Sequence, residues 1–253
     1  MRSSISSSRS GQASAAAIAV VALGLSASVV AATTYIALYF VNTLGLTPFQ
    51  TGLRFLPFTG ASFLAAPVAA RLSQRIPPRV LVPAGSALIA VGMWLMTGLD
   101  GASDWTHLLP GSIIAGLGLG TTSAVLSQAA LSAVEPERAG MATGAANTFR
   151  QIGLAAGVAD LGALFAHSST QDVQTQLAGH GIPPESVGRL ADAVGNGAGV
   201  QVAAGLTGQA APVGAGVARA ATAAGLDQAL WAGTIIATAA TLLAVVMLAV
   251  RPD

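Results

Sequence analysis

The chain contains a series of apolar runs, each long enough to cross the hydrocarbon core of a lipid bilayer. A transmembrane helix takes about 20 consecutive apolar residues, and six stretches of the sequence meet that length. They cover residues 13–41, 52–70, 80–99, 108–133, 139–166 and 228–250. The sequence therefore predicts an all-α, polytopic membrane protein with six transmembrane helices.

The composition agrees with a chain that is solvated by lipid. Only 8% of the 253 residues are charged and 53% are hydrophobic, whereas soluble domains usually carry about 25% charged residues. The formal net charge of +1 argues against nucleic acid as a partner. Because the sequence holds no cysteine, disulfides, thiolate catalysis and cysteine-bound metals are excluded.

The distribution of arginine predicts an orientation in the plasma membrane. Three arginines fall in the connection after the second run, and Arg138 lies in the connection two runs later. The opposite short connections hold Asp100 and Asp104, and of basic residues only Arg54, at a helix edge. Short cytoplasmic loops carry the excess of positive charge, so both termini are expected to be cytoplasmic. The three arginines of the first connection are Arg71, Arg75 and Arg79.

The expected organisation follows from these spans. A cytoplasmic tail at residues 1–12 precedes five transmembrane helices within 13–167, and an extracellular loop at 168–227 leads to the last helix at 228–250. Residues 200–225 offer a seventh span, but an arginine, a proline and many glycines favour a mobile loop.

The N-terminus has an alternative interpretation as a secretory signal, because a polar, basic start precedes an apolar run. That run continues to Val41, which is too long for a typical signal core. An uncleaved first helix is therefore favoured.

Pairs of glycines predict close contacts between helices. The stretch G-L-G-L-G at 116–120 lies inside a span with no strand before it, so it does not indicate a nucleotide-binding loop. Gly116 and Gly120 have the spacing that lets two membrane helices approach closely. Gly140/Gly144 and Gly153/Gly157 repeat this spacing on different faces of the fifth run, which predicts more than one neighbour for that helix.

An arginine lies deep inside the fifth run. At 100° per residue, Arg150 shares one face of a helix with Thr143, Asn147, Gln151 and Leu154. An arginine at the centre of a membrane helix costs roughly 2.5–3.5 kcal/mol on insertion scales, so such a stripe faces the bundle interior or a water-filled cavity. Two roles remain open for Arg150: a structural anchor to another helix, or a cavity-lining role in transport.

Two other polar residues are weaker candidates. Asp160 follows Arg150 by ten residues, roughly 80° round the helix and about 15 Å along it. The two side chains therefore cannot pair directly, and Asp160 either has a function or reaches the outer interface. Gln128 and Ser127 lie near the cytoplasmic end of the fourth run, where a structural use is the default.

The fifth run resembles a helix of a known family. Its pattern G-x-x-x-G-x-x-N-x-x-R-Q-x-G-x-x-x-G is similar to the fifth helix of the C-terminal half of the major facilitator superfamily, and more narrowly of its fourteen-helix drug:proton antiporters. Residues 38–57, 109–120 and the D-Q-A-L-W-A-G segment at 227–233 agree with the same group. The resemblance extends over about 13–250.

The connection R-L-S-Q-R-I-P-P-R at 71–79 resembles the cytoplasmic loop motif of this family. Arg75 and Arg79 fit its basic positions, but the aspartate of the motif is absent. A charge relay through this loop is thus in doubt, whereas contact with anionic lipid headgroups is retained.

The resemblance implies one half of a transporter that exports small amphiphilic molecules or drugs in exchange for protons. Family members have two six-helix halves around a central cavity, so the chain is expected to be a fragment or a half that pairs with a second six-helix bundle. The alternative is a non-transporting truncated protein or an accessory subunit. An enzyme is not expected, because the histidines His107, His167 and His180 lack the spacing of a ligand set. No cofactor or metal is expected.

Overall fold

The protein is described by a computed structural model that covers residues 28–100, 103–132, 139–178, 183–204 and 210–249. Every regular element in these ranges is a helix. The predicted tail at 1–12 and the beginning of the first predicted span lie outside the described residues.

Five of the helices are long and apolar enough to cross a membrane, so the predicted all-α, polytopic class is confirmed. A shorter apolar helix, Ser28–Thr43, is the described part of the first predicted span, and it ends in a π-helical turn, η1 (Tyr39–Thr43). The other helices are α2 (Pro48–Leu72), α3 (Pro78–Leu95), α4 (Trp105–Ser132), α5 (Ala139–Leu177), α6 (Pro184–Gly195), α7 (Gly199–Ala204) and α8 (Ala210–Ala249).

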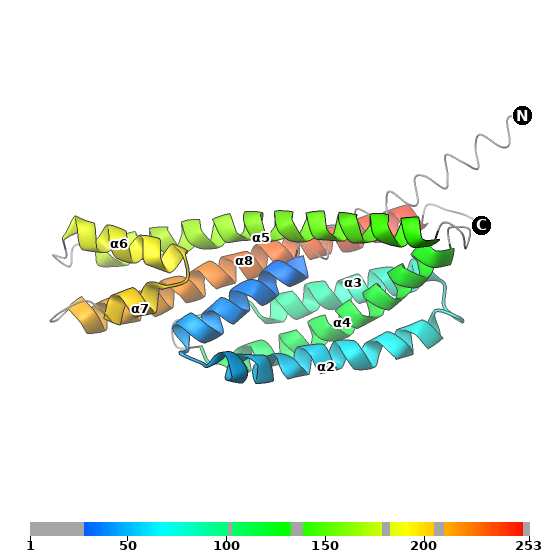
Figure 1. Ribbon diagram of the computed structural model, residues 1–253, viewed down its shortest axis with the longest axis horizontal. Helices are drawn as coiled ribbons and strands as arrows, with labels where there is room; N and C mark the ends of the chain where they lie inside the picture. The colour runs from blue at the N-terminus through cyan, green and yellow to red at the C-terminus, as the bar shows by residue number, and fades with distance from the viewer. Residues whose placement is uncertain (1–27, 101–102, 133–138, 179–182, 205–209, 250–253) are drawn as a thin grey trace, which may run out of the picture.

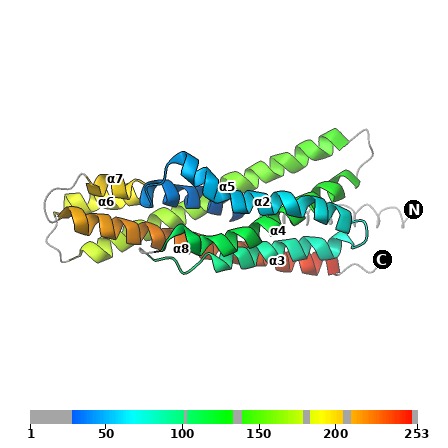
Figure 2. The same cartoon turned by 90° about the horizontal axis from the view of Figure 1, so that it is seen from below.

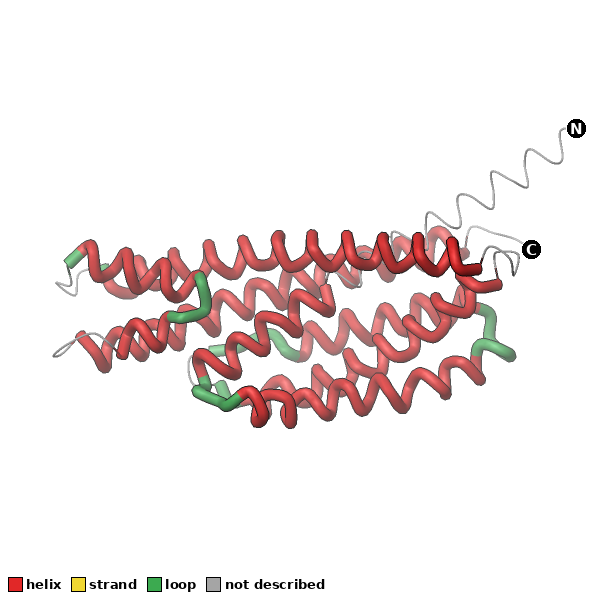
Figure 3. The backbone as a smooth tube through the Cα atoms, viewed as in Figure 1, coloured by secondary structure: helices red, strands yellow, loops and turns green. Residues whose placement is uncertain are grey.

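The long helices run side by side along one axis (Figures 1 and 3). Helix α4 packs between α2 and α3, α3 packs on α8, and α8 packs on α5. The helix Ser28–Thr43 lies between the α5–α8 pair and the α2–α4 pair in Figure 1. Its Tyr35, Tyr39 and Phe40 belong to the main buried cluster, together with Met93 of α3 and Phe165 of α5.

The glycines of α4 allow its close contacts on two sides. A Cβ added to Gly116 would collide with the carbonyl oxygen of Phe58 in α2, and one added to Gly120 would collide with that of Ser62. The close packing predicted for this pair is therefore confirmed. Gly118 faces the opposite neighbour, since an added Cβ would lie 2.6 Å from the carbonyl oxygen of Gly85 in α3.

Local hydrogen bonds fix the beginning of α2. The Thr47 hydroxyl accepts a hydrogen bond from the Gln50 backbone amide, and the Gln50 side chain accepts one from the Thr47 amide, both at 3.2 Å. This reciprocal pair is a capping box, and Pro48 follows it at the first helical position. Gly45 adopts φ +66° just before it, which turns the chain after η1.

Helices α5 and α8 extend well beyond the thickness of a bilayer. With 39 and 40 residues, they are about 58 and 60 Å long at 1.5 Å per residue, against about 30 Å of hydrocarbon. Figure 1 shows α6 and α7 beside the C-terminal end of α5 and the N-terminal end of α8. These four segments bury a second cluster of apolar residues: Val173, Leu177, Leu190, Ala191, Val194, Ala203, Ala218 and Ala221.

The segment predicted as a loop, 168–227, thus contains helix over most of its described length, which differs from the prediction. Helix α5 continues ten residues past 167, and α8 begins at Ala210 and passes without a break into the last span. A separate span at 200–225 is not formed. The physical reason is that alanine favours helix and that these short apolar faces bury one another.

An aspartate of α8 joins this helix to the connection after α3. The Asp227 carboxylate accepts hydrogen bonds from the backbone amides of Gly98 at 2.6 Å and Leu99 at 3.4 Å. Gly98 has φ +84°, a conformation that favours glycine. One side chain therefore satisfies two amides that no helix ladder reaches.

We expect Asp227→Ala to lower the free energy of unfolding by about 1–2 kcal/mol, because it removes charge-assisted hydrogen bonds to two amides that water replaces only in part. The loss is measured as a lower midpoint of thermal unfolding by circular dichroism in detergent. Asp192→Ala is the matched control, since Asp192 is an exposed aspartate of α6. Equal midpoints for the two variants would contradict the proposed role of Asp227.

Candidate functional site

The predicted polar stripe lies along the N-terminal half of α5, and its described side chains are exposed. Asn147, Arg150 and Gln151 all point away from the packed core. Within the described part of the chain, no hydrogen bond or ion pair reaches the Arg150 guanidinium. The structure therefore supplies no anchor for Arg150 from these residues, and its role stays a prediction.

This end of α5 has open space beside its small residues in the described part of the chain. A Cβ added to Gly140 or Gly144 would meet no described atom within 4 Å. Figure 2 shows the N-terminal end of α5 diverging from the other helices. An exposed polar face and an unoccupied pair of small residues thus lie on the same stretch of helix.

Further along α5, one face becomes buried. Gly153, Gly157, Leu161 and Phe165 are buried at successive four-residue steps. The ring of Tyr35 from the first described helix stacks on Phe165, with 5.1 Å between ring centroids. The Tyr35 hydroxyl donates a hydrogen bond of 3.0 Å to the carbonyl oxygen of Val158. Among the described residues, α5 therefore packs closely from its middle onward.

The other predicted candidates lie apart from this stripe. Asp160 is exposed on α5. Gln128, near the end of α4, accepts a hydrogen bond from the hydroxyl of Ser73, which ends α2. This bond connects the ends of α2 and α4, which is a structural use of Gln128.

The arginines of the predicted loop motif are exposed at the same end of the bundle. Arg71 lies in the last turn of α2, Arg75 in the turn that follows and Arg79 in the first turn of α3. Figure 1 shows that the end of α4 and the beginning of α5 also lie at this end.

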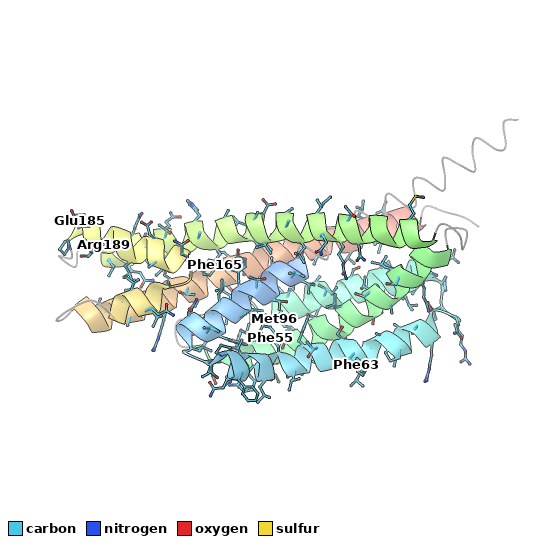
Figure 4. The ribbon with its side chains drawn as sticks, in the orientation of Figure 1. Phe55, Phe63, Met96, Phe165, Glu185 and Arg189 are labelled. Atoms are coloured by element: carbon cyan, nitrogen blue, oxygen red, sulfur yellow. The ribbon has the colours of Figure 1, made fainter. Side chains whose placement is uncertain are left out.

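The structure reveals a pocket that the sequence did not indicate. It lies among the first described helix, α2, α3 and α4, and encloses about 530 Å³ of empty space, part of it open to solvent. Phe55 and Met96, labelled in Figure 4, are two of its lining residues. Arg54 and Trp105 line it as well.

The sequence analysis placed Arg54 at a helix edge and did not select it as a candidate. Arg54 nevertheless lies within an apolar span, which is the same signal that identified Arg150. Its environment was not predictable because Trp105 comes from another helix, 51 positions along the chain. The Arg54 guanidinium carbon lies 5.1 Å from the centre of the Trp105 ring. Such a contact is a cation–π interaction.

The described residues contain no cluster that could bind a metal ion. No three histidine or acidic side chains among them are close enough to hold a metal ion. His107 is used locally, with its Nε2 atom 2.9 Å from the carbonyl oxygen of Thr97.

Comparison of the sequence with known protein families identifies a match to one family. Residues 3–158 match the model of the Major Facilitator Superfamily. The chain is 35% identical to the puromycin resistance protein pur8 of Streptomyces alboniger over 154 residues, which are 59% of this chain and 30% of that protein.

Two further relatives carry names of the same kind. The multidrug resistance protein Stp of Mycobacterium tuberculosis is 34% identical over 128 residues, which are 51% of this chain and 24% of the relative. The multidrug efflux pump LfrA of Mycolicibacterium smegmatis is 27% identical over 166 residues, 66% of this chain and 32% of the relative. In each pair the match covers less than a third of the relative.

Proposed function

Because the chain belongs to the major facilitator superfamily, we propose that it is the C-terminal half of a transporter that exports small amphiphilic molecules or drugs from the cell. The names of its relatives, which are resistance and efflux proteins, support this choice of substrate class. Its five membrane-length helices fit a multi-pass protein of the plasma membrane.

The observation that carries the proposal is the exposed polar face of α5. Asn147, Arg150 and Gln151 would be costly if they faced lipid. A water-filled substrate cavity, closed on its far side by a second six-helix bundle, removes that cost. The open positions at Gly140 and Gly144 leave room for such a bundle to approach.

Export would then follow alternating access, in which this bundle rocks against the second one around a central substrate site. Protons are the proposed coupling ion, on the resemblance to drug:proton antiporters. The second bundle is either the remainder of a longer chain or another subunit.

The proposed orientation places both termini in the cytoplasm. It is supported by the exposed arginines at 71–79, which share one end of the bundle with the end of α4 and the beginning of α5. These arginines would hold that end close to anionic lipid headgroups.

Deletion of the gene in the source organism tests the function without assuming where the natural chain begins or ends. We expect steady-state accumulation of a panel of amphiphilic compounds, puromycin and ethidium among them, to rise several-fold for at least one compound. An uncoupler that collapses the proton gradient should raise accumulation in the parent strain to the same level. It should have little further effect in the deletion strain.

Unchanged accumulation of the whole panel would favour the alternative, a truncated or accessory membrane protein. If accumulation rises on deletion but the uncoupler has no effect in the parent strain, export stands and proton coupling is rejected. Blotting the natural product with a chromosomal C-terminal tag separates a longer chain from a half of 24.9 kDa.

A further inference from the structure

The pocket among the first described helix, α2, α3 and α4 combines an apolar wall with one cation. Its lining includes the aromatic side chains of Phe40, Phe55 and Phe58, with Met93 and Leu108. Small-molecule sites are concave and mostly apolar, with a few polar groups that fix the orientation of the ligand. The charged group in this lining is Arg54.

The donors of Arg54 are only partly used. One terminal nitrogen, Nη1, donates a hydrogen bond of 3.2 Å to the carbonyl oxygen of Gln50 in the same helix. The Nε atom is buried and has no hydrogen-bond partner among the described residues. A buried donor without a partner is unfavourable, and more so when it carries charge.

The guanidinium also contacts Trp105, with its carbon 5.1 Å from the centre of the ring. A cation–π contact is an electrostatic attraction to the ring and supplies no oxygen or nitrogen acceptor for the N–H groups. No carboxylate of the described residues forms an ion pair with Arg54. An acceptor from outside the chain would reach the buried Nε atom only after a shift of the side chain, but Arg54 lines the pocket and has donors that no described residue uses.

We propose that this pocket binds the acidic head group of an amphiphilic molecule, a carboxylate or a phosphate, through Arg54, while the apolar body of the molecule lies among the aromatic side chains. Carboxylates and phosphates match the planar donor fork of arginine and accept two parallel hydrogen bonds from it. The site differs from the polar stripe of α5 and does not depend on the proposed export.

Binding is measured on the full chain in phosphatidylcholine nanodiscs, with Trp105 as the reporter. Trp94→Phe and Trp231→Phe remove the other two tryptophans, both of which are exposed. The probe is para-bromophenylacetate, whose bromine quenches a nearby indole, and the neutral comparison is para-bromophenylethanol. We expect the carboxylate to bind with a dissociation constant about tenfold below that of the alcohol.

Three variants locate the interaction. Arg54→Gln should weaken binding of the carboxylate about tenfold and leave binding of the alcohol unchanged. Arg54→Lys keeps the charge but not the planar donor fork, so its affinity for the carboxylate should lie between those of the parent chain and Arg54→Gln. Ser112→Leu should weaken the binding of both probes, because Ser112 lines the pocket and a larger side chain fills it. Arg189→Gln is the charge-matched control, as Arg189 pairs with Glu185 on α6.

Helical content by circular dichroism is compared for every variant, so that loss of folding is separated from loss of binding. Equal binding of the two probes to the parent chain, or unchanged binding of the carboxylate to folded Arg54→Gln, would overturn the proposal.

A second arm identifies the source of the acidic group. Nanodiscs with added phosphatidylglycerol should abolish the difference between the parent chain and Arg54→Gln if a lipid headgroup occupies the site. The difference should persist if the ligand is a free amphiphile.

Discussion

Replacing Gly118 with alanine is expected to destabilise the bundle by about 2 kcal/mol, a large part of the stability of an ordinary protein. The added Cβ would lie 2.6 Å from the carbonyl oxygen of Gly85 and 2.7 Å from the amide nitrogen of Ile89. Both are backbone atoms of α3, so no side chain can move aside and the two helices must separate. Reversible unfolding in mixed detergent micelles, followed by circular dichroism, measures the change.

Gly60→Ala is the matched control for this substitution. Gly60 also lies inside a membrane-length helix, α2, but an added Cβ there would meet nothing within 4 Å. Since alanine favours helix over glycine by up to about 1 kcal/mol, this variant should be neutral or slightly more stable. A similar response at both positions would show that helix propensity, and not the contact between α3 and α4, determines the effect.

Replacing Arg150 with alanine should reduce export by about tenfold or more, to nearly the level of the gene deletion, if the polar stripe of α5 lines the substrate cavity. A single charge-assisted contact to substrate or transported ion is worth about 1.5–3 kcal/mol, which is at least tenfold in affinity. The amount of protein in the membrane should not change, because no described residue pairs with this side chain. Efflux rates and membrane blots are measured on the same cells.

Arg189→Ala is the control, because it removes an arginine from the exposed side of α6. Normal export by Arg150→Ala would reject the cavity role. A parallel fall in export and in membrane protein would instead support the other role that the sequence left open, an anchor to a neighbouring helix.

The membrane-length helices were predictable because span length is a local property of the sequence. The apolar runs at 52–70, 80–99 and 108–133 correspond closely to α2, α3 and α4. The contacts of Gly116 and Gly120 were predictable for a similar reason, since their spacing places both on one side of a helix.

The parts that sequence reasoning missed depend on contacts between distant segments. The helical structure within 168–227 forms because α6 and α7 bury apolar faces against the ends of α5 and α8. No apolar run in the sequence predicts such packing. The pocket combines Arg54 of α2 with Trp105 of α4. Its composition follows from which helices become neighbours, and the order of residues along the chain does not specify that.

The packing of α6 and α7 against α5 and α8 has a mechanical consequence. Helices α5 and α8 are joined there by the buried cluster that includes Val173, Leu190, Val194 and Ala218, whereas the opposite end of α5 has open space beside Gly140 and Gly144. A rod that is held more firmly at one end than at the other pivots about the held end. On the contacts of the described residues, any swing of α5 during a transport cycle would be smallest at the buried cluster and largest near Asn147 and Arg150.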